Sequence, residues 1–214
     1  MPPPLSPLNE WKADMAKLIS SAQTALAAGL VFCAIILAIW LLGSTVDPLG
    51  LTSFLVRWVH VFAGIIWVGM IWFVNFIQLA AVAEADDAGR AALMKLIVPR
   101  VALTFKRAAH VTVLSGLALL VATGYLFDRW VFLSAVYIPP LKGALLWLGV
   151  GAAFAMWVIA HMIIAPNLRI LTGEVAADDA GQAVARSRVR TFARLNLVLA
   201  IPVTFVMVAA AHLY

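Results

Sequence analysis

The chain has 214 residues, of which 64% are hydrophobic and 12% are charged, and its mean hydropathy is +1.02. Soluble domains carry about 45–50% apolar and about 25% charged residues, so this composition excludes an ordinary soluble domain and indicates an integral membrane protein. The formal charge of +5 comes from basic residues that lie between apolar segments, which points to membrane lipid as the partner and not to nucleic acid.

Residues 1–21 contain four prolines and lack the basic start and small-residue cleavage pattern of a signal peptide. We therefore expect them to form a cytoplasmic N-terminal segment. The remainder, 22–214, is expected to form a single transmembrane bundle.

Five apolar segments reach the length of about 20 residues that a helix needs to cross the hydrocarbon. They lie at about 22–43, 53–83, 103–127, 140–165 and 191–213. The polar link between the second and third segments is expected to hold a short surface helix closed by Pro99. Trp130 and Tyr137, before the fourth segment, suit an interfacial aromatic belt. The predicted fold class is an all-α integral membrane protein with five transmembrane helices, four of which form a haem-binding bundle.

The lysines and arginines predict the orientation of this bundle. Five spans place the two termini on opposite sides, and twelve of the fifteen basic residues fall on the side of the N-terminus. Because positive charge concentrates on the cytoplasmic side, we expect a bacterial inner-membrane protein with a cytoplasmic N-terminus and a periplasmic C-terminus.

The four histidines are the main candidates for chemistry. One falls in each of spans two to five, namely His60, His110, His161 and His212. With alternating span directions, His60 and His212 lie towards the outer side, and His110 and His161 towards the inner side. At 1.5 Å per residue, the two layers are expected to be separated by roughly 15–20 Å.

Two histidines on facing helices match the axial ligands of one b-type haem, so this pattern predicts two haems per chain. Each histidine taken alone is also compatible with an interfacial or structural role. Copper or zinc would need further Cys, Met or carboxylate ligands, and the span interiors contain no Asp or Glu. The only cysteine, Cys33, excludes both a cysteine cluster and the attachment of a c-type haem.

Other residues fit a haem site in a supporting role. Arg57 and Arg107 each precede a histidine by three residues, on the same helix face, where a guanidinium could pair with a haem propionate. Gly64 follows His60 by one turn and leaves room for a flat macrocycle. Trp67 and Trp157 could flank such a ring. Each of these residues also suits membrane anchoring or helix packing.

Three polar side chains in or near the spans complete the set of candidates. Asn75, Gln78 and Asn196 could form hydrogen bonds between helices or line a quinone pocket. Lys142, Arg190 and Arg194 are further, weaker candidates for propionate pairing.

Two stretches, RWVHVFAGIIWVG and WVIAHMIIAPNLRILTG, resemble the transmembrane N-terminal region of the bacterial membrane-bound urate oxidases. The resemblance covers spans two to four and is carried by Arg57, Trp58, His60, Gly64, Trp67, Gly69, Trp157, Pro166 and Asn167. Members of that family also carry a c-type cytochrome domain, for which this sequence has no attachment cysteines. A looser similarity exists to copper-resistance membrane proteins and to haem-binding protoporphyrinogen oxidases. The resemblance implies membrane redox chemistry with a separate electron partner.

The function predicted from the sequence is a di-haem b-type membrane cytochrome that transfers electrons across the membrane as a subunit of a larger redox complex. Expected partners are a cytochrome c or a dehydrogenase, with a quinone as a further possibility, and no catalytic residue is assigned. Two alternatives remain open: a urate-oxidase-like or porphyrinogen-oxidising membrane enzyme, and a copper-handling or assembly protein.

Overall fold

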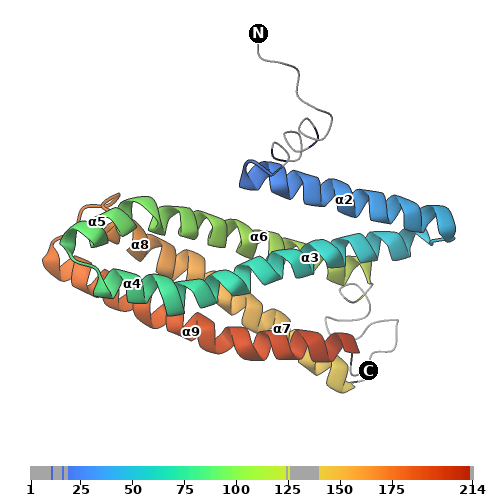
Figure 1. Ribbon diagram of the computed structural model, residues 1–214. Helices are drawn as coiled ribbons and strands as arrows, with labels where there is room; N and C mark the ends of the chain where they lie inside the picture. Colours follow the sequence, from blue (N-terminus) through green and yellow to red (C-terminus); the bar gives the residue numbers. More distant parts are fainter. Residues whose placement is uncertain (1–10, 12–15, 17–18, 124, 126–139, 213–214) are drawn as a thin grey trace, which may run out of the picture. The chain divides into compact units, whose positions relative to one another are not determined.

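The computed structural model describes Trp11, Ala16, residues 19–123, Tyr125 and residues 140–212. The described residues are helical apart from short turns and contain no strand, and five helices are long and apolar enough to span a membrane (Figure 1). The prediction of a five-span helical membrane protein is therefore confirmed. Trp130, Tyr137 and most of the segment 1–21 lie outside the described residues, as does the side chain of Lys142.

The chain divides into two compact units, residues 1–50 and 51–214, which are described separately. The first contains α2 (Ala22–Gly43), which coincides with the first predicted span. This helix begins at a capping box, in which the Ser21 hydroxyl accepts from the Thr24 amide and the Thr24 hydroxyl accepts from the Ser21 amide, each at 3.1 Å. The two bonds satisfy amide groups that the first turn of a helix leaves unpaired.

The second unit contains the other four spans, three of which are interrupted or preceded by short elements. Its helices are α3 (Pro48–Phe73), η1 (Val74–Gln78), α4 (Leu79–Glu84), α5 (Asp87–Leu96), α6 (Val98–Ala122), α7 (Pro140–Val158), η2 (Ile159–Ile164), α8 (Ala165–Leu171) and α9 (Asp179–His212). The first residues of α3 fall in the other unit. The predicted surface helix exists as α5, whose cap is the Asp86 side chain accepting from the Gly89 amide at 2.8 Å.

Two predicted boundaries were wrong. Pro99 does not close the surface helix but lies in the first turn of α6, where its missing N–H removes no helical hydrogen bond. The last helix begins at Asp179, about three turns before residue 191, because the stretch DAGQAVARSRVR is rich in helix-forming Ala, Arg and Gln.

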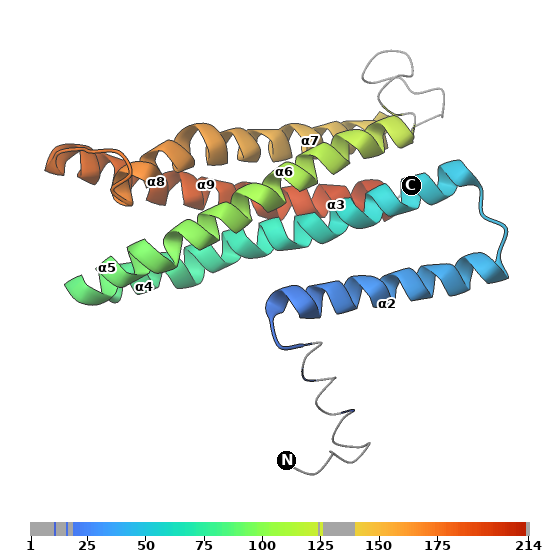
Figure 2. The ribbon, with the colours of Figure 1, turned by 90° about the horizontal axis from the view of Figure 1, so that it is seen from above.

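The four spans of this unit run antiparallel to their neighbours. Ser53 near the start of α3 donates to the carbonyl of Ala122 at the end of α6, at 3.4 Å. Asn196 of α9 donates to the carbonyl of Met156 in α7, at 3.3 Å, and α9 packs along α7, η2 and α8. Figure 2 shows α9 lying beside α7 and α8, with α3 and α6 forming the other pair.

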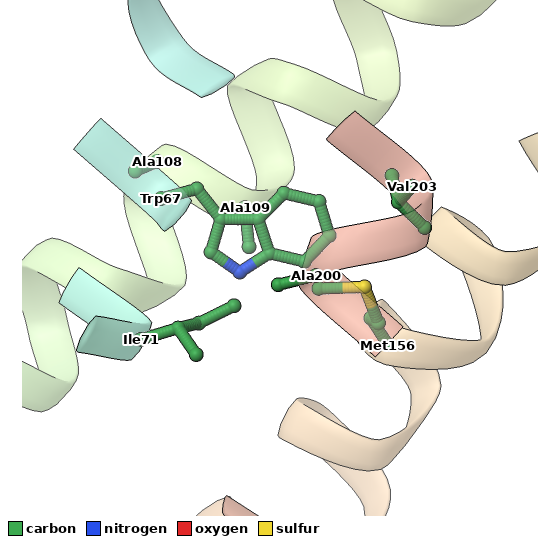
Figure 3. Close-up of a cluster of buried hydrophobic side chains, with 7 residues drawn as sticks. All are labelled: Trp67, Ile71, Ala108, Ala109, Met156, Ala200 and Val203. Carbon is green, nitrogen blue, oxygen red and sulfur yellow. The ribbon is translucent and has the colours of Figure 1, made fainter. Parts of the chain in front are cut away.

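The centre of this unit is filled by Trp67, which is 2% exposed. It contacts residues from all four spans, and Figure 3 shows its ring surrounded by Ile71, Ala108, Ala109, Met156, Ala200 and Val203. The alanines allow the helix backbones to approach, as is usual for contacts between helices in membranes. Trp67 therefore packs in the core at the level where the candidate ligands are found.

Candidate functional site

His110 of α6 and His161 of η2 are in direct contact. The Nε2 atom of His161 lies 3.2 Å from the Nδ1 atom of His110, and the two ring centres are 4.4 Å apart with an interplanar angle of 87°. Both residues are partly buried. The structure thus brings together the two histidines that were predicted to form the inner pair.

The hydrogen bonds of these rings fix their tautomers. His110 Nδ1 lies 2.7 Å from the carbonyl of Lys106, and His161 Nδ1 lies 2.8 Å from the carbonyl of Trp157, one turn earlier in each helix. A carbonyl oxygen only accepts, so both Nδ1 atoms carry the proton. The single Nδ1 proton of His110 is shared between the Lys106 carbonyl and the lone pair of His161 Nε2. An imidazole held at Nδ1–H in this way is oriented to offer Nε2 to a metal.

Trp157 forms the third member of this cluster. Its ring stacks on that of His161, with centres 4.5 Å apart, and meets the edge of His110 at 5.5 Å. Its indole nitrogen is buried without a described partner. Of the two tryptophans predicted to flank a cofactor, Trp157 lies against the histidine pair.

His60 is positioned by α6 and not by the other outer histidine. Its Nδ1 donates to the carbonyl of Thr112 at 2.9 Å, with the Ser115 hydroxyl at 3.4 Å. The ring lies against Gly116, where an added Cβ would be 2.9 Å from His60 Cε1. Gly116 therefore has no side chain because the imidazole occupies that space.

No described contact joins His60 to His212. His212 is exposed in the last turn of α9. The helix register still places the two residues towards the same end, because Asn75 of η1 donates to the carbonyl of Ala193 in α9 and the two helices run in opposite directions. The outer pairing of His60 with His212 stays a prediction.

The expected separation of the two histidine layers was wrong. His60 contacts α6 between Thr112 and Gly116, which are only two to six residues beyond His110, or about 3–9 Å along the axis. The sequence-based figure assumed that His110 lies at the start of its span, whereas α6 and α5 extend that helical segment well before it.

The remaining predicted site residues are spread over the surface and the core. Arg57 and Arg107 are exposed on α3 and α6, one turn before their histidines, and no ion pair is described for either. Gly64 faces Thr112, and an added Cβ there would make an ordinary contact of 3.8 Å. Trp67 belongs to the core. Their roles toward a cofactor stay predictions.

A cavity of about 430 Å³ lies between the four spans of the second unit, next to His161. Its wall is mainly aliphatic, and its polar members are Asn75, Gln78, Asn196, Lys106, His161, Arg169, Thr172 and Glu174. Arg169 pairs with Glu174 at 3.2 Å where both are exposed. The sequence offered a pocket lined by the three amides as one of two alternatives. It did not predict the size or shape of the cavity, because these depend on how the helices cross.

Both π-helical segments contribute to this cavity, η1 through Asn75 and Gln78 and η2 through His161. A π-helical turn inserts an extra residue into an α-helix and occurs frequently at functional sites. No periodicity in the sequence distinguishes these segments, so they were not predicted.

Comparisons with known proteins give no further assignment. No family model matches the chain, and searches of curated proteins and of solved structures found no match. Within the described residues there is also no cluster of three or more His, Cys, Asp or Glu side chains suited to a metal ion. The histidine pair and the adjoining cavity therefore carry the functional argument.

Proposed function

We propose that the protein is a b-type membrane cytochrome and that His110 and His161 are the axial ligands of one haem. The observation that carries this proposal is the contact between two imidazoles from two different spans, each held at Nδ1 by the carbonyl of its own preceding turn. Two histidines on facing helices are a common ligand set of a haem in a helical bundle. A haem held there would supply a one-electron carrier within the membrane.

Two imidazole nitrogens are suitable ligands for a haem iron, but the distance between the two rings must increase before an iron can lie between them. Imidazole–metal bonds are about 2 Å long, so two ligand nitrogens on opposite sides of one iron lie about 4 Å apart. The closest ring nitrogens of the pair are 3.2 Å apart, and one of them is a protonated Nδ1. With both Nε2 atoms on one iron the ring centres would be about 6 Å apart, against 4.4 Å in the structure. The two rings must therefore move apart, and His110 must turn its Nε2 towards its partner. Trp157 would then flank the bound ring.

Surrounding residues suit the anionic side chains of a haem. Arg107 lies three residues before His110 and is exposed, so its guanidinium is available for a propionate. Lys106 is adjacent to it and faces the cavity. Arg57 has the equivalent position relative to His60.

His60 and His212 form the second ligand pair of the proposal, on the predicted periplasmic side. This part is supported by their shared end of the unit and by the absence of any other histidine in the sequence. The electrons would pass between a quinone pool or dehydrogenase and a periplasmic carrier such as a cytochrome c. In this proposal the protein is an electron-transfer subunit of a larger redox complex in the inner membrane.

The haem content of single variants tests the ligand assignment. His110→Ala and His161→Ala should each lose the same haem, and His60→Ala and His212→Ala should each lose the other. Met162→Ala is a matched control, because this residue follows His161 in the chain and its side chain is 63% exposed. If either inner variant retains the full haem content of the wild type, His110 and His161 are not the ligands.

A further inference from the structure

Three buried amide oxygens around the cavity have no described hydrogen-bond donor: Asn75 Oδ1, Gln78 Oε1 and Asn196 Oδ1. Asn196 is 1% exposed and Gln78 is 9% exposed. An unpaired acceptor is costly in a membrane interior, where no bulk water compensates it. Three of them in the wall of one cavity indicate a site that receives hydrogen-bond donors.

The orientation of two of these amides is fixed by their other atom. Asn75 Nδ2 donates to the carbonyls of Ile71 and Ala193, at 2.9 and 3.2 Å, and Asn196 Nδ2 donates to that of Met156. Rotating either amide by 180° would set an oxygen against a carbonyl oxygen. The unpaired atoms of Asn75 and Asn196 are therefore acceptors and not misassigned donors.

The rest of the wall restricts the kind of molecule that would donate. Side chains such as Ile71, Phe105 and Ile164 make the lining largely apolar, and the cavity lies among membrane-spanning helices. Its volume of about 430 Å³ falls within the range of small-molecule sites, about 300–1,000 Å³. A matching ligand is neutral, apolar in its body, soluble in lipid, and equipped with at least two O–H or N–H donors.

We propose that this cavity binds the headgroup of a hydroquinone, with one hydroxyl group donating to Gln78 Oε1 and the other to Asn75 Oδ1 or Asn196 Oδ1. The three oxygens are closed to a water-sized molecule in the structure, so the amide side chains must shift to meet the hydroxyl groups. For Asn75 and Asn196 this shift stretches the hydrogen bonds of their Nδ2 atoms. The oxidised quinone has carbonyl oxygens in place of hydroxyl groups and cannot donate to these acceptors. These three acceptors therefore favour the reduced form.

The cavity adjoins the histidine pair, so a preference for the reduced quinone bears on the proposed electron transfer. His161 belongs both to the histidine pair and to the cavity wall. A bound hydroquinone would lie beside the inner ligand pair, which makes it the electron source for that site. Binding itself does not require a haem, whereas the role as electron source rests on the proposed function.

Binding is tested on the purified full-length protein in detergent, under anaerobic conditions, with decylubiquinol as the probe. Its 1,4-dimethyl ether and decylubiquinone are matched ligands, since neither can donate a hydrogen bond. We expect decylubiquinol to raise the thermal unfolding midpoint and to bind about fivefold or more tightly than either control, as the loss of one or two hydrogen bonds predicts. Equal binding of decylubiquinol and its ether would overturn the proposal, without any need for a variant.

A substitution then locates the site. Gln78→Met removes one acceptor at similar volume, and Gln78 forms no described hydrogen bond between helices, so the fold should be retained. We expect it to weaken decylubiquinol binding about fivefold, while Gln182→Met, at an exposed position of α9, leaves binding unchanged. Wild-type affinity in Gln78→Met would overturn the assignment of the cavity. A colourless protein that still binds decylubiquinol selectively would overturn only the haem proposal.

Discussion

Replacing Gly116 by alanine should displace His60 from its position against α6. The added Cβ would lie 2.9 Å from His60 Cε1 and 3.2 Å from Nδ1, whereas ordinary contacts begin at 3.4 Å. The imidazole must therefore retreat by about 0.5 Å or more, which lengthens its 2.9 Å hydrogen bond to the Thr112 carbonyl towards the limit of about 3.5 Å. The substitution thus disturbs a defined contact between α3 and α6.

The expected loss of stability combines three terms. Overpacking costs about 1–3 kcal/mol, and the lost hydrogen bond costs about 0.5–1.5 kcal/mol. Against this, alanine favours a helix over glycine by about 1 kcal/mol. We therefore expect Gly116→Ala to lower the free energy of unfolding by about 0.5–3.5 kcal/mol.

Unfolding by increasing mole fractions of sodium dodecyl sulfate, followed by tryptophan fluorescence, measures this difference. Gly69→Ala is the matched control, because an added Cβ at Gly69 of α3 meets nothing within 4 Å and reports the helix-propensity gain alone. If Gly116→Ala is as stable as Gly69→Ala to within about 0.5 kcal/mol, the packing of His60 against Gly116 is refuted.

Two further predictions concern the helix contacts that support the site. Trp67→Ala should lower the free energy of unfolding by about 3 kcal/mol in the same assay, since Trp67 is 2% exposed in the core. Trp72 is 47% exposed, so Trp72→Ala should lower it much less. Similar losses for the two variants would contradict the assignment of Trp67 to the core. Gly149→Ala should be about 1–3 kcal/mol less stable than Gly151→Ala. The Cβ at Gly149 would lie 2.9 Å from Val206 Cγ2 in α9, whereas a Cβ at Gly151 meets nothing within 4 Å and, as at Gly69, gives only the gain in helix propensity. Equal thermal midpoints for the two glycine variants would contradict the close approach of α7 and α9.

The sequence alone predicted the membrane spans and the proximity of His110 and His161. Length and hydropathy determine whether a helix can cross the bilayer, so α2 was predicted to the residue and the other four spans were all found. The pairing of His110 with His161 followed from their depth in adjacent antiparallel spans, and the structure places them in contact. Both inferences use only distance along a helix.

Features that depend on how helices pack were not predictable. The level of His60 opposite Thr112 and Gly116 is set by the register of α3 on α6, which periodicity does not specify. The cavity and the unpaired oxygens of Gln78 and Asn196 depend on the crossing of four helices and on two π-helical turns. The sequence showed only that polar amides occur in the spans, which is a general sign of function in membrane proteins.

The most direct test of the central claim is the haem content of the purified protein from haem-replete membranes. We predict a reduced-minus-oxidised spectrum with a b-type band, and a pyridine haemochrome value of about two haems per chain, one for each pair of axial histidines. A value near one that disappears in His161→Ala would retain the inner site and reject the outer pair. A colourless protein would contradict the assignment of this chain as a cytochrome.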